Sequence, residues 1–167
     1  MSTTSLSITT HNSLLRLIAL GAIIIGTVQA VIQEWIVYSL VEKNPFMSVL
    51  QYIASAVIGN AAFEGGIATA LFGLLLHFIV SFVIAGVFIL SVDRIQFLRR
   101  YAIAGALLYG FGVFIVMNLI VVPLSAAPPL PAPTVPQRVE VILEHVLVIG
   151  LSLGILVRQN VRTDINT

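Results

Sequence analysis

The stretch GIATALFGLLLHFIVSFVIAGVFILSV, residues 66–92, decides the fold of this chain. No charged residue interrupts it, and the first charges come directly after it at Asp93 and Arg94. A helix needs about 20 consecutive apolar residues to cross the hydrocarbon core of a bilayer, and this run is longer than that. We therefore expect it to cross a membrane as a single helix.

A stripe of small and polar side chains follows helical spacing along this predicted span. Its members are Gly66, Ala70, Gly73, His77, Ser81 and Ala85. Polar groups are costly in lipid, so the stripe is expected to face other helices. At 1.5 Å per residue, His77 lies roughly 15 Å from the outer end of the helix, which is close to the bilayer centre.

The composition of the whole chain agrees with a membrane location. Its 167 residues are 59% hydrophobic and only 9% charged, with a mean hydropathy of +1.08. We expect one integral membrane domain whose partner is lipid, with other membrane subunits or further copies of the chain as possible neighbours. A net charge of +1 and the lack of a basic patch argue against nucleic acid as a partner. The absence of cysteine excludes disulfides, thiolate metal sites and cysteine nucleophiles.

The apolar runs predict an all-α, polytopic membrane protein with a bundle of four transmembrane helices. The expected spans are residues 14–41, 66–92, 101–122 and 138–157, within a single domain of residues 14–158. A short helix over residues 46–58 is amphipathic and is expected to be interfacial or re-entrant. The remaining segments are a disordered tail (1–13), a tight basic loop (93–100), a proline-rich outer strap (123–136) and a cytoplasmic tail (159–167). Thr134 and Gln137 have the spacing of a capping box for the last span.

The first span has a second interpretation, a cleaved signal peptide. Residues 17–25 resemble its apolar core, and Val28-Gln29-Ala30 resembles a small-residue cleavage site. The leader, however, lacks the expected positive charge, and the helical pattern continues beyond the proposed cut. We predict a retained span, and the sequence leaves cleavage open.

Small residues spaced for close helix contact occur in all four predicted spans. They are Ala22, Gly26 and Ala30 in the first, Gly73 in the second, Ala106 and Gly110 in the third, and Gly150 and Gly154 in the fourth. Small residues at such spacing allow two helix backbones to approach closely in a membrane. We expect these positions to be helix contacts.

The basic residues predict the orientation. Arg16, Arg94, Arg99, Arg100, Arg158 and Arg162 fall on the side of the two termini, whereas the other side has only Lys43 and Arg138. The positive-inside rule then places both termini in the cytoplasm. All glutamates, Glu34, Glu42, Glu64, Glu140 and Glu144, fall on the outer side.

Several polar residues in or near the spans are candidates for a functional role. The set is His77, Glu144, His145, Glu140, Glu64, Glu34 and Asn118. One hypothesis is structural, with His77 bonded to a backbone carbonyl or to Asn118. A second is a path for protons, cations or a small solute. A third is haem or chlorophyll binding, with His77 and His145 as metal ligands. A fourth is an accessory subunit of a larger membrane complex.

The chain lacks several motifs of known enzymes: HExxH, a phosphate-binding glycine loop and an acidic pair spaced for metal-assisted transfer. We therefore expect no catalytic residues and no resident cofactor or metal, with His77 and His145 as the weak exceptions named above.

The second half of the chain resembles the YagU-type family of small bacterial inner-membrane proteins. The resemblance rests on four pieces: His77 with Phe78-Ile79-Val80-Ser81, Ala104-Gly105-Ala106-Leu107, Pro123-Leu124 before the proline-rich segment, and His145 with Val146-Leu147. It implies an inner-membrane location and supports both histidines as shared features, but it implies no reaction. Where the family pattern has glycine before the last histidine, this chain has Glu144.

Overall fold

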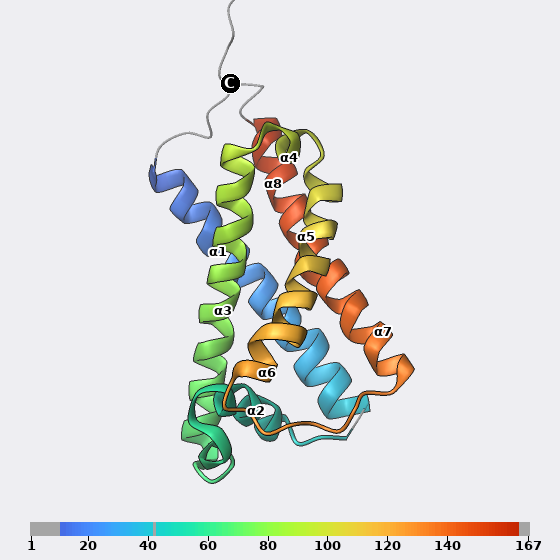
Figure 1. Cartoon of the computed structure of the whole chain (residues 1–167). Helices are drawn as coiled ribbons and strands as arrows, with labels where there is room; N and C mark the ends of the chain where they lie inside the picture. The colour runs from blue at the N-terminus through green and yellow to red at the C-terminus, as the bar shows by residue number, and fades with distance from the viewer. Residues whose placement is uncertain (1–10, 42, 164–167) are drawn as a thin grey trace, which may run out of the picture.

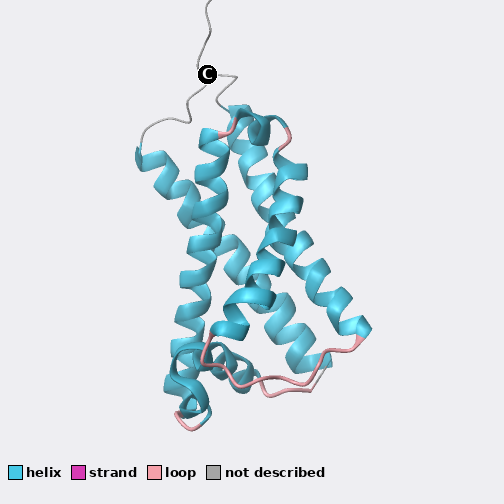
Figure 2. Cartoon of the chain, in the orientation of Figure 1, coloured by secondary structure: helices cyan, strands magenta, loops and turns pink. Residues whose placement is uncertain are grey.

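The computed structural model describes residues 11–41 and 43–163, and all regular structure within them is helical (Figure 2). Five of the helices are long and apolar enough to cross a membrane: Ser13–Val37, Phe46–Phe63, Gly66–Arg94, Ala102–Leu124 and Val135–Asn160. The predicted all-α class is thus confirmed for the described residues. Such helices are what a membrane location requires.

The first long helix consists of α1 (His11–Gln29) and a wider π-type continuation, η1 (Ala30–Val41). It begins three residues before the predicted start at residue 14, within the polar segment that we expected to be a disordered tail. Residues 1–10 of that tail lie outside the described part.

The last helix also runs further than expected, because α8 (Ser152–Thr163) continues past residue 157 into the predicted cytoplasmic tail. The polar residues that follow the apolar run, such as Gln159, are compatible with a helix that extends beyond the hydrocarbon.

The second helix, α2 (Phe46–Ile58), covers the range of the short helix expected from the sequence. Gly59 ends it with a positive φ of 62°, a conformation that glycine adopts without steric cost. A 3₁₀ turn, η2 (Gly59–Phe63), follows and leads into the next helix. Figure 1 shows α2 at the bottom of the molecule, at the end where α3 begins.

The central helix is α3 (Gly66–Arg94), and a short helix, α4 (Gln96–Arg100), follows it at the opposite end. The segment 93–100 is therefore largely helical, not the basic loop that we expected. Arg99 explains why this segment is compact. Its guanidinium donates to the carbonyl oxygens of Val92, at 3.1 Å, and Asp93, at 2.6 Å, at the end of α3. A cation at this position also favours the negative end of the α3 dipole.

The third predicted span is α5 (Ala102–Val116), continued by η3 (Met117–Val121) and α6 (Val122–Leu124). The fourth is α7 (Val135–Glu144), η4 (His145–Leu151) and α8. The proline-rich strap is shorter than predicted, because Pro123 and Pro136 both lie within helices. A proline in the first turn of a helix loses no intrahelical hydrogen bond, which explains Pro136. Gln137 Oε1 accepts from the Thr134 backbone N–H at 2.9 Å and caps α7.

Glycines mark the closest helix contacts. A Cβ built on Gly110 would lie 3.1 Å from both Gly150 N and Val146 Cα, and one on Gly150 would lie 2.7 Å from Ala106 O. The backbones of α5 and η4 therefore pack directly on one another. Gly73 allows a similar approach of α3 to α2, where a Cβ would meet the Leu50 carbonyl carbon at 2.8 Å.

The remaining predicted packing residues lie in comparable places. A Cβ on Gly26 of α1 would meet the Phe78 ring of α3 at 2.8 Å, and one on Gly154 of α8 would meet Ile103 Cα of α5 at 3.0 Å. Ala22 and Ala106 are buried, whereas Ala30 is only half-buried. Figure 1 shows the result: the start of α1 and the ends of α3 and α8 lie at one end, and α2 and the start of α7 lie at the other.

Candidate functional site

A cluster of polar side chains lies where α7 and η4 pack near η1, and we call it the α7 polar cluster. It consists of Gln33, Glu140, Glu144 and His145. The Gln33 Nε2 atom donates to Glu140 Oε2 at 3.3 Å. Glu144 follows Glu140 by one helical turn and is only 6% exposed, as is Gln33. The cluster thus contains one buried carboxyl group and one half-buried carboxyl group nearer the start of α7.

Glu144 and His145 form a buried pair. Glu144 Oε2 lies 2.6 Å from His145 Nδ1, and the same Nδ1 lies 2.9 Å from the Val141 carbonyl oxygen. A backbone carbonyl can only accept a hydrogen bond, so Nδ1 carries a hydrogen in this arrangement. The Glu144 carboxyl oxygen then accepts from the same N–H. The pair fixes the orientation of the imidazole, which also packs edge-on against the Phe114 ring of α5, with the ring centres 5.8 Å apart.

Two buried oxygen atoms of the cluster lack a hydrogen-bond donor among the described residues. Glu144 Oε1 and Gln33 Oε1 are buried and find no hydrogen-bond partner in the part of the chain that the structure describes. Buried polar atoms are nearly always paired, and an unpaired one costs about 1–3 kcal/mol, more when it is charged. Both atoms are acceptors, so the cluster is short of a hydrogen-bond donor or a cation.

His77 lies elsewhere in the bundle and serves to join two helices. Its Nε2 is 2.9 Å from the Gly26 carbonyl oxygen of α1, and its ring packs edge-on against Phe78. This contact is of the kind that the structural hypothesis predicted. Before His77 could bind a haem or chlorophyll metal through Nε2, the bond to Gly26 would have to break.

The structure does not gather the other predicted site residues into the cluster. Asn118 donates from Nδ2 to the Phe114 carbonyl oxygen of its own helix at 3.1 Å. Glu64 is exposed in the turn before α3, and Figure 1 shows the starts of α3 and α7 on opposite sides of the same end. The Glu34 side chain is outside the described part. Within that part, no group of three or more His, Cys, Asp or Glu side chains is placed to hold a metal ion.

Gln33 is the member of the cluster that the sequence analysis missed as a site residue. An amide within a mostly apolar helix was a usable signal, because such residues in membrane spans generally face protein. Gln51 is a second buried amide, and it donates to the Gly66 carbonyl oxygen at 3.0 Å. Gln51 therefore ties α2 to the start of α3.

The fold and the cluster together define a class: an all-helical protein with helices of membrane-spanning length and a buried acidic group in the bundle. No family model matches the chain, and no curated protein or solved structure matches it either.

Proposed function

We propose that the chain is a four-span protein of a bacterial inner membrane, related to the YagU-type family, whose α7 polar cluster binds a proton or a small monovalent cation from the outer face. Two observations support four crossings. The segments on both sides of α2 lie at the same end of the molecule in Figure 1, which supports an interfacial or re-entrant α2. The basic residues concentrate at the opposite end, which favours cytoplasmic termini.

The observation that carries the proposed function is the unpartnered oxygen of Glu144. One carboxyl oxygen is bonded to His145, while the other is buried without a partner among the described residues. A proton on that oxygen, or a cation beside it, removes the cost of a bare carboxylate in a low-dielectric bundle. Gln33 Oε1, the other unpartnered oxygen of the cluster, is a neutral ligand of the kind that hard cations accept.

The part of the bundle toward α4 has an apolar core. Ile25, Ile89, Ile149 and Leu153 are fully buried and belong to one apolar core that extends toward the end with α4. Polar groups therefore accompany a bound ion only part of the way across. We infer that the cluster is the outer part of a transport path, whose inner side is closed in this arrangement and whose apolar core opens when the ion passes across. This role is non-enzymatic.

Glu144→Gln tests the proposal in proteoliposomes that contain a pH-sensitive or sodium-sensitive dye. The amide keeps the shape of the side chain but neither ionises nor releases a proton, so we expect flux under an imposed potential to fall by roughly tenfold or more. Glu64→Gln makes the same chemical change at an exposed residue and should retain wild-type flux. Equal flux for wild type and both variants, or equal loss in both variants, would refute the role of the cluster.

A further inference from the structure

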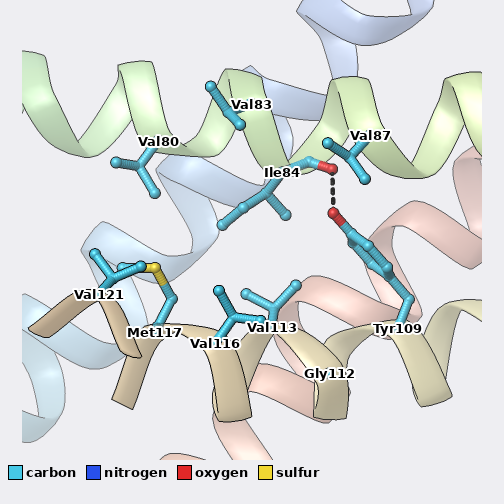
Figure 3. A pocket seen from close by; sticks show the side chains of 10 residues that line it. All are labelled: Val80, Val83, Ile84, Val87, Tyr109, Gly112, Val113, Val116, Met117 and Val121. Carbon is cyan, nitrogen blue, oxygen red and sulfur yellow. Dashed lines mark hydrogen bonds between the residues drawn. The ribbon is translucent and has the colours of Figure 1, made fainter. Parts of the chain in front are cut away.

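A groove lies between α3 and the helix formed by α5 and η3 (Figure 3). Its volume is 520 Å³, within the range of about 300–1,000 Å³ that is usual for small-molecule sites. Val80, Val83 and Val87 line it from α3, and Val113, Val116 and Met117 line it from the other helix. The wall is apolar, so the groove suits a hydrocarbon chain.

The groove stays open because of two neighbouring residues on α5. Tyr109 donates from its hydroxyl to the Ile84 carbonyl oxygen at 2.8 Å and sets the spacing of the two helices (Figure 3). Gly112 has no side chain, and a Cβ built on it would meet nothing within 4 Å. Val83 is 56% exposed and Val87 51% exposed, so the groove opens sideways, toward the lipid of a surrounding bilayer.

Positive charge lies at one end of the same helix face. Val80, Val87 and Arg94 are each seven residues apart and therefore share a face of α3. The Arg94 side chain is 82% exposed, and its Nε lies 3.9 Å from Asp93 Oδ2. Asp93 is also bound by Arg99, at 3.2 Å. Arg100 lies with its guanidinium 5.5 Å from the centre of the Tyr101 ring. Two guanidinium groups thus contact Asp93, and that of Arg100 follows a few residues later at the same end.

We propose that the groove and this basic end together bind an anionic phospholipid of the adjoining leaflet. Its phosphate contacts Arg94 and Arg100, and one acyl chain follows α3 into the groove. At 1.5 Å per residue, Val87 lies about 10 Å and Val80 about 21 Å from Arg94 along the helix. These depths bracket the roughly 15 Å thickness of one hydrocarbon leaflet. The charge complementarity favours an anionic headgroup over a zwitterionic one.

Native mass spectrometry of the full chain tests the site, after mild-detergent extraction and addition of phosphatidylglycerol or phosphatidylcholine. We expect the wild-type protein to retain phosphatidylglycerol in preference to phosphatidylcholine. Arg94→Gln should lose this preference, whereas Arg16→Gln, an exposed arginine on α1, should keep it. Gly112→Leu places a side chain in the open groove and should reduce retention of both lipids several-fold. Ala104→Leu adds the same side chain at an exposed position of α5 that does not line the groove, and it should retain both.

Each contrary result overturns a defined part of the proposal. Equal loss of preference in Arg94→Gln and Arg16→Gln would mean a diffuse surface charge in place of a headgroup site. Unchanged retention in Gly112→Leu would mean that no acyl chain occupies the groove. A dimer that dissociates in Gly112→Leu, without any change in lipid, would assign the groove to a second copy of the chain.

Discussion

Gly110→Ala is expected to destabilise the helix bundle strongly. The added Cβ would lie 3.1 Å from Gly150 N and from Val146 Cα, and closer still to the His145 carbonyl oxygen. All three atoms belong to the backbone of η4, which cannot rotate away as a side chain would. Overpacking of a tight contact costs about 1–3 kcal/mol and occasionally more, so we expect a loss of about 3 kcal/mol in the free energy of unfolding. Titration with SDS, followed by the fluorescence of the single tryptophan, Trp35, measures this change.

Gly112→Ala is the matched control on the same helix. Its Cβ points into open space, and the substitution removes the helix penalty of glycine, which is roughly 1 kcal/mol. We therefore expect unchanged or slightly raised stability. Similar unfolding curves for the Gly110 and Gly112 variants would show that α5 and η4 do not pack as closely as described here.

Helical class and most helix positions followed from the sequence because a bilayer imposes simple rules of length and hydropathy. Boundaries were less predictable, because they depend on single contacts. Arg99 reaches back to the end of α3 and compacts the segment that was expected to be a loop. Pro123 and Pro136 were read as parts of an extended strap, yet each lies in a helix. Pro136 lies in the first turn of α7, where its missing N–H costs no hydrogen bond, and Pro123 lies one residue before the end of its helix at Leu124.

The candidate site was only partly predictable. Glu140, Glu144 and His145 lie close together in the sequence on one helix, so their proximity follows from helical spacing. Gln33 joins them from a segment more than 100 residues away, and this contact depends on how the first and last spans cross. For the same reason the sequence left open whether His77 and His145 meet. The structure gives them different helix neighbours, Gly26 for His77 and Phe114 for His145.

Replacement of each member of the buried pair is expected to give unequal effects on stability. His145→Leu leaves Glu144 without its partner, with both carboxyl oxygens buried. Breaking a buried pair in this way costs about 3–5 kcal/mol, and we expect a loss in that range. Glu144→Leu removes the acid and its unsatisfied oxygen and leaves His145 bonded to Val141. We expect its unfolding free energy to be close to that of the wild type. SDS titration of both variants at neutral pH provides the comparison.

The double variant, Glu144→Leu with His145→Leu, decides what the pair is for. If the pair served only to hold the His145 ring against Phe114 of α5, removal of either member would destabilise the bundle, and the double variant would be no better than the worse single one. If the acid is kept for ion binding at a cost in stability, the double variant should recover most of the loss caused by His145→Leu. The reason is that replacement of a buried ion pair by apolar side chains of similar volume is often neutral or stabilising. A protein that loses flux with Glu144 while keeping or gaining stability has retained a buried carboxyl group that its fold does not need.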